Sequence, residues 1–255
     1  MDGSAVRGNG TVFEGTLVET AAARSVIHLA DAQVALAPDS RLRVYHDRAV
    51  LEKGSGVVRD GMHYSFEAAT LRITPAALAS VVQIELNGPS LLTVAARGGP
   101  AEVYNSSNIL AGRVMPGMAL AFEPQVGTPT AVQVTGIVEA RDGAFFLTDE
   151  TTKVTVQLTG IDLAKNVGKM VTITGTSVPD AAPAGGASQV VHVANVKKVP
   201  AGAGAAAAGS GGAGSSAGLS TVAIVAIVGG VAVAGAIGGL AATGAFSSGA
   251  SVSRP

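Results

Sequence analysis

The histidines are the residues of this chain best suited, by type, to metal binding or proton transfer. They stand far apart in the sequence, as His28, His46, His63 and His192. Two metal ligands on one element normally need a short, regular spacing, which none of these positions has. We expect surface or hydrogen-bonded histidines, and no metal site.

One carboxylate pair, Asp149 and Glu150, could in principle do acid–base chemistry. It falls at a predicted hairpin turn, where such side chains accept hydrogen bonds from the local backbone, so we expect a structural role. Residues 209–214 match the G-x-G-x-x-G dinucleotide pattern but follow no predicted strand and open no helix. We therefore predict no enzyme activity, no catalytic residues, and no cofactor or metal.

Composition narrows the class of protein further. The 255 residues carry a formal net charge of −1 with 14% charged residues, which argues against a nucleic-acid binder. Cysteine is absent, so disulfides and thiolate sites are excluded. Tryptophan is also absent and aromatic residues make up 4%, so side chains that could stack on bases or sugars are scarce.

The chain up to about residue 125 alternates apolar and polar residues in short runs separated by turn residues, which predicts β-strands. Residues 53–56 (Lys-Gly-Ser-Gly) read as a turn, and 75–80 as one helical turn. The predicted strands cover residues 26–29, 33–36, 41–45, 49–52, 70–74, 81–86, 91–96, 101–104 and 119–122.

The order of turns and apolar residues in this first part resembles the FecR domain over about residues 12–123. The matching positions are Gly15, Thr20, Ser25, Leu29, Asp31, Leu36, Pro38 and Ser40, with support from Leu51, Gly54, Val94, Gly98, Val103 and Gly117. The resemblance implies an all-β, solenoid-like or sandwich-like domain of the bacterial periplasm that acts as a sensor or interaction module.

This chain departs from the family plan in one respect. Well-known FecR proteins place a cytoplasmic region and a membrane helix before the domain, and they signal to a sigma factor. Here the FecR-like segment starts close to Met1 and the long apolar run comes last. Sigma-factor control is therefore not carried over.

A second β unit is predicted over residues 130–199. Its five predicted strands, with a helical turn at 163–167 before the fourth, resemble a bacterial OB-fold, a small Greek-key barrel. The resemblance rests on Gly136, Asp149, Gly160, Gly168 and Gly175. We expect Phe145 and Phe146 to fill the barrel. Because Lys153, Lys165 and Lys169 are offset by nearby acidic residues, we expect a structural or protein-binding barrel and no nucleic-acid partner.

The end of the chain predicts a membrane anchor. Residues 200–217 form a Gly/Ala/Ser-rich linker, and 219–246 are apolar, long enough as a helix to cross a hydrocarbon core of about 30 Å. Within that run the helix-packing pattern comprises Gly230, Ala234, Gly235 and Gly239. The alternative is a low-complexity tail. A short polar tail, 247–255, completes the chain.

These observations together predict a mainly β protein with a FecR-like domain at 1–125, an OB-like barrel at 130–199 and a C-terminal transmembrane helix. The expected function is a non-enzymatic sensor or protein-interaction module of the bacterial envelope, bound to the membrane and to an envelope protein. Its β domains are expected in the periplasm, although the first residues show no export signal. Alternatives are a carbohydrate-binding or scaffolding protein and, more remotely, a hydrolase; a homo-oligomer through the membrane helix stays open.

Overall fold

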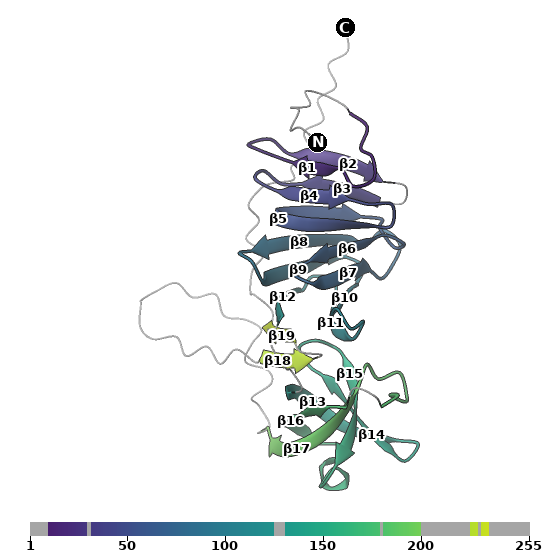
Figure 1. Ribbon diagram of the computed structural model, residues 1–255. Helices are drawn as coiled ribbons and strands as arrows, with labels where there is room; N and C mark the ends of the chain where they lie inside the picture. Colours follow the sequence, from purple (N-terminus) through teal and green to yellow (C-terminus); the bar gives the residue numbers. More distant parts are fainter. Residues whose placement is uncertain are drawn as a thin grey trace, which may run out of the picture.

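The computed structural model describes residues 10–29, 32–124, 131–178, 181–199, 225–228 and 231–234. Within these ranges the regular structure consists of nineteen β-strands and one short 3-10 helix. The expectation of a mainly β protein is confirmed. Figure 1 shows two β units along the chain, a long stack of strands followed by a smaller curved unit.

Two sheets make up the first unit and share one long strand, β5 (Arg48–Arg59). One sheet continues from β5 through short strands on both sides. Its other members, in spatial order, are β1 (Leu17–Glu19), β4 (Arg41–Val44), β6 (Ser65–Ala68), β7 (Leu71–Pro75), β10 (Ala101–Tyr104) and β11 (Leu110–Val114).

The other sheet contains the second part of β5 and lies opposite the first. Its other members, again in spatial order, are β2 (Ser25–Leu29), β3 (Ala32–Leu36), β8 (Val81–Asn87), β9 (Leu91–Gly98) and β12 (Ala119–Pro124). In Figure 1 the strands of both sheets run across the stack, one below another.

The core of the first unit lies between its two sheets. Alternate residues of each strand point inward, so Ile73 and Val103 from one sheet share a buried cluster with Val82 and Val94 from the other. Each of these four side chains is fully buried. Full burial of an aliphatic side chain of this size contributes about 1.5–3 kcal/mol.

The turn predicted at residues 53–56 is wrong, because β5 runs straight through it and passes from one sheet to the other. Lys53 pairs with Arg41 in the first sheet, while Gly54 pairs with Leu86 in the second. Gly54 has a φ of +81°, and a Cβ at this position would lie 2.4 Å from Ser40 Oγ. Glycine at this position therefore lets one strand change sheets.

The helical turn predicted at 75–80 is also wrong. Strand β7 extends to Pro75, and the backbone N–H of Ala76 donates to Pro100 O at 2.9 Å, which fixes this segment against the neighbouring strand connection. Ala79 then adopts a φ of +57°, which no right-handed helix contains.

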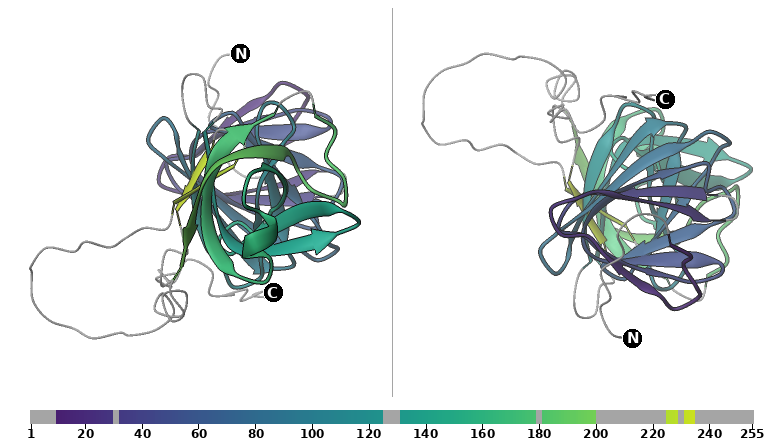
Figure 2. Two further views of the ribbon diagram at one scale, coloured as in Figure 1. Left: turned by 90° about the horizontal axis from the view of Figure 1, so that it is seen from below. Right: turned by 90° about the horizontal axis from the view of Figure 1, so that it is seen from above.

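Five strands and the 3-10 helix form the second unit. They are β13 (Ala131–Arg141), β14 (Ala144–Asp149), β15 (Thr155–Gly160), η1 (Ala164–Asn166), β16 (Met170–Ser177) and β17 (Val190–Lys198). Their pairings close a ring in the order β13, β14, β15, β17, β16 and back to β13. The strands curve around a second buried core that includes Val134, Leu147, Val156 and Ile173 (Figure 2).

Two short strands, β18 (Val225–Val228) and β19 (Val231–Ala234), form a hairpin; β19 pairs with β12, and β18 meets β13 at Gln133. Both lie in 219–246, where a membrane helix is predicted, so the structure differs from the prediction at these two segments. The remainder of that range, the linker 200–217 and the tail 247–255 lie outside the described residues. No helix among the described residues has the length and apolar character needed to span a bilayer.

Candidate functional site

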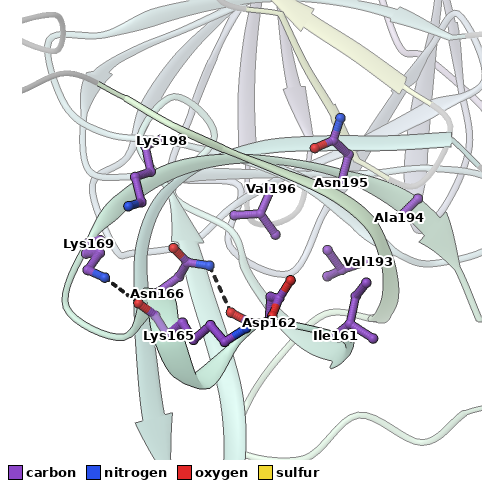
Figure 3. Close-up of a pocket in the computed structure, with 10 residues that line it drawn as sticks. All are labelled: Ile161, Asp162, Lys165, Asn166, Lys169, Val193, Ala194, Asn195, Val196 and Lys198. Atoms are coloured by element: carbon purple, nitrogen blue, oxygen red, sulfur yellow. Dashed lines mark hydrogen bonds and ion pairs between the residues drawn. The ribbon is translucent and has the colours of Figure 1, made fainter.

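A groove opens on the second unit between the segment that follows β15 and the last part of β17 (Figure 3). Its volume is about 370 Å³. We call it the β17 groove. Its lining residues are Ile161, Asp162, Lys165, Asn166, Lys169, Val193, Ala194, Asn195, Val196 and Lys198.

The groove exists because β15 ends before β17 does. The two strands run parallel and pair only from Gln157 opposite Val190 to Gly160 opposite Val193. Gly160 has a φ of +124° and Asp162 a φ of +61°, so the chain turns away into η1 at this point. Beyond Val193, β17 keeps β16 as a neighbour on one side and has the groove on the other.

One end of the β17 groove is cationic. Lys165 Nζ lies 2.6 Å from Asp162 Oδ1, and this hydrogen bond and charge raise the pKa of Lys165 above its ordinary value. Lys169 Nζ donates to the carbonyl oxygen of Lys165. With Lys198 exposed at the end of β17, the groove carries three ammonium groups against one carboxylate.

The other end is apolar. Val193 is 3% exposed and belongs to the core of the second unit, while Val196 packs against that core from its edge. Ile161 is 73% exposed beside them. In Figure 3 Ile161 and Val193 lie at the opposite end of the groove from Lys169 and Lys198. The groove therefore has a cationic end and an end where apolar side chains lie beside Asp162.

A second hollow, of about 350 Å³, lies on the first unit beside the β6–β7 turn. Its two charged lining residues are both engaged: Glu67 lies 3.7 Å from Arg48 Nε, and Arg72 donates to Asn108 Oδ1. The Arg72 guanidinium also lies 5.1 Å from the centre of the Tyr104 ring, and Tyr104 Oη donates to Glu102 at 2.5 Å. Glu102 also pairs with Arg113 at 2.6 Å. Burial, and then the hydrogen bond to Glu102, raise the pKa of Tyr104 to about 12. This network ties together β7, β10 and β11.

The predicted separation of the histidines agrees with the structure. His28 lies on β2 and His192 on β17, and all four side chains are exposed at separate places. Among the described residues no three His, Asp or Glu side chains gather closely enough to hold a metal ion.

Asp149 has the structural role expected from the sequence. Its side chain is fully buried, and Oδ1 accepts hydrogen bonds from Thr151 N at 3.0 Å, Thr152 N at 2.7 Å and Thr152 Oγ1 at 3.0 Å. Oδ2 accepts a further bond from Thr135 N at 2.8 Å. Glu150, by contrast, is exposed and lies 3.3 Å from Lys153 Nζ. Asp149 therefore holds the turn together, and Glu150 forms an ion pair on its surface.

The two phenylalanines face opposite ways, so the expectation that both fill the barrel is half wrong. Phe145 packs against the core of the second unit. Phe146 is on the outer face and is 3% exposed, because the loop before β17 covers it. A Cβ at Gly185 would lie 2.8 Å from Phe146 Cζ, and the Arg141 guanidinium lies 5.6 Å from the ring centre. Neither ring offers a free stacking surface.

Of the predicted helix-packing residues, the structure describes Ala234 alone. It ends β19 and pairs with Val225 and Ala121. Gly230, Gly235 and Gly239 lie outside the described residues.

Sequence reasoning missed the β17 groove. In the sequence, acidic residues lie near Lys165 and Lys169, and Lys198 is distant from both. One sequence signal for the groove was Gly160. This glycine adopts a positive φ and ends β15, so β15 stops before its neighbour β17 does. The chain matches no protein-family model and no curated protein.

Proposed function

We propose that this chain is a membrane-anchored protein of the bacterial envelope whose two β units serve as a non-enzymatic sensor or protein-interaction module. The observation that carries the proposal is the presence of open strand edges at one end of the first unit. In the described part of the chain, β1 pairs with β4 alone and β2 with β3 alone. Open edges of this kind bind other chains through backbone hydrogen bonds.

We also propose finer fold assignments for both units. Two facing sheets of stacked short strands support a FecR-like first domain. The second unit has the ring order of an OB-fold, with β15 and β17 parallel and η1 placed before the fourth strand. These features support an OB-like barrel.

The anchor in this proposal is the apolar run at 219–246. No Asp, Glu, Lys or Arg occurs between Lys198 and Arg254, and Ile and Val are frequent in the run. A helix of this length satisfies its own backbone in lipid and needs no polar face. Insertion as a helix would require the β18–β19 hairpin to separate from β12 and β13. The linker at 200–217 separates the barrel from the bilayer, and helix pairing through Gly235 and Gly239 would form a homo-oligomer.

A nucleic-acid partner is disfavoured by two observations. Phe146, the aromatic residue on the outer face of the barrel, is covered by the chain itself. Several arginines on the outer face of the first unit are engaged by carboxylates, as in Arg41 with Glu19 at 3.1 Å and Arg43 with Glu52 at 3.0 Å. A nucleic-acid surface needs free cations that follow a phosphate backbone.

Cross-linking tests the proposal. The full chain, expressed in a bacterial host and cross-linked in intact cells, is expected to be recovered from solubilised membranes in a discrete complex with an envelope protein. Recovery of the chain without any cross-linked protein would contradict the interaction role. Binding on a glycan array that disappears when the second unit is deleted would favour the carbohydrate-binding alternative.

A further inference from the structure

We propose that the β17 groove binds an extended acidic segment of a partner protein, which adds as a strand to the edge of β17 that no described strand occupies beyond Val193. This inference rests on the proposed function, because it names the site and the partner chemistry of the interaction module. Four features carry it: the backbone of β17, the size of the groove, its charge and one buried amide.

The backbone of β17 offers unused hydrogen-bonding groups to the groove. Val199 N donates to Met170 O at 3.1 Å, which identifies a hydrogen-bonded pair between β17 and β16. Bonded and non-bonded pairs alternate along antiparallel strands, so Val196 and Lys198 direct their N–H and C=O groups away from β16. Within the described ranges, no backbone hydrogen bond joins either residue to the segment 161–169.

The groove has room for a short peptide segment. Its volume of about 370 Å³ is at the lower end of typical ligand sites. The register shift at Thr174 and Gly175 leaves Ala194 as the extra residue of β17, at the point where β15 stops. The bulge therefore marks the boundary between the closed part of the barrel and the open edge.

Charge complementarity selects an acidic segment. Lys169 and Lys198 lie at the cationic end of the groove, and the neighbouring Lys165 has Asp162 as its carboxylate partner. At the apolar end, the exposed Ile161 lies beside Val193. A segment that presents a carboxylate at one end and an aliphatic side chain at the other would match both ends.

Asn166 provides a further polar contact. It is 7% exposed although it lines the groove, and its Nδ2 donates to Asp162 O at 2.8 Å. Its side-chain oxygen has no hydrogen bond among the described residues and can accept one from the backbone N–H of a bound segment.

The test uses the full chain in detergent micelles and a fluorescent, N-acetylated heptapeptide with Glu residues in one half and Val residues in the other. Fluorescence anisotropy is expected to show saturable binding. The double variant K169E/K198E should weaken it about tenfold or more, since each tenfold loss corresponds to about 1.4 kcal/mol. The matched variant K53E, at an exposed lysine of the first unit, should leave the affinity unchanged.

The backbone contribution is tested separately. V196P removes an N–H that β16 does not use, so it should abolish binding. V196A also loses contacts with the barrel core but keeps the N–H, so it should still bind. A peptide with N-methylated Val residues should also fail to bind. Equal binding of a Lys/Val heptapeptide, binding of an oligo-dT in its place, or no binding of the Glu/Val peptide would overturn the proposal.

A cross-linking arm separates this inference from the proposed function. If V196P still forms the same cross-linked complex in cells, the interaction module stands and the β17 edge is not its contact. If wild-type protein forms no complex while the peptide still binds the groove, the β17 edge stands as a peptide site and the cellular role fails.

Discussion

The backbone N–H of Arg113 donates a 2.7 Å hydrogen bond to the carbonyl oxygen of Thr152, and this bond joins strand β11 of the first unit to the turn after β14 in the second. The N–H and hydroxyl of the same Thr152 bind the buried carboxylate of Asp149. Leu110, at the start of β11, packs against the core of the second unit. The Asp149 turn is therefore both a local structure and a contact between the units.

Replacement of Asp149 by alanine should lower the free energy of unfolding by about 2–4 kcal/mol. The substitution leaves three buried or half-buried N–H donors, those of Thr135, Thr151 and Thr152, without their acceptor. Urea unfolding of the full chain in detergent measures the change. The adjacent exposed variant E150A serves as a control and should change stability by less than about 0.5 kcal/mol. Equal effects of the two variants would contradict the structural role of Asp149.

Gly112, next to this contact, should not tolerate a methyl group. A Cβ at Gly112 would lie 2.8 Å from Cε1 and 3.1 Å from Cζ of Phe122, whose side chain is fully buried. G112A should therefore destabilise the protein by about 1–3 kcal/mol, as overpacking of a core does. G56A is the matched control, because its nearest contact is at 3.4 Å. Thermal unfolding followed by circular dichroism should show a lower Tm for G112A and a nearly unchanged one for G56A; the reverse order would refute this packing.

High pH should weaken the first unit through Tyr64. Its hydroxyl donates to Tyr45 O at 2.6 Å and to Arg48 O at 2.5 Å, and burial raises its pKa to about 12. A pKa raised in the folded state gives stability that is complete below the ordinary value of about 10 and is lost as pH rises through about 12. Absorbance of the phenolate and urea unfolding between pH 9 and pH 12 test this.

The variant Y64F isolates this effect, since it keeps the ring but has no proton to lose. Its stability should fall less steeply above pH 10 than that of the wild-type protein. An identical alkaline fall in the two proteins would show that Tyr64 does not control it. Tyr104, whose pKa is also raised to about 12, remains in both proteins and contributes equally.

Local sequence pattern predicted most strands because each has a buried and an exposed face. Residues 101–104 match β10 at both ends, and 81–86 match β8 to within one residue. Three short strands of the first unit were missed, β1, β6 and β11, and the β18–β19 hairpin lies where a helix was predicted. The three strands of the first unit have a common cause. They span only three to five residues and exist because longer neighbours pair with them. The sequence around Gly54 resembles a turn for a similar reason. Its role is to let β5 pass from one sheet to the other, and this depends on the close approach of Ser40, which is distant in the sequence.

The candidate site was less predictable than the fold. The β17 groove depends on the parallel pairing of β15 with β17, two strands separated in sequence by η1 and β16. Its lysines come from separate segments, and no local spacing connects Lys169 with Lys198. The closing of the ring brings them to one place. Asp149 was predictable because its partners are its sequence neighbours.

Protease accessibility in intact spheroplasts is the most direct measurement of the central claim, a β interaction module held at the outer side of the cytoplasmic membrane. Cells would express the full chain with a tag at residue 1, and an external protease would be added before and after lysis. We expect loss of the tag and of the β units in intact spheroplasts, with a cytoplasmic control protein preserved. Survival of the tagged β units until lysis would contradict it.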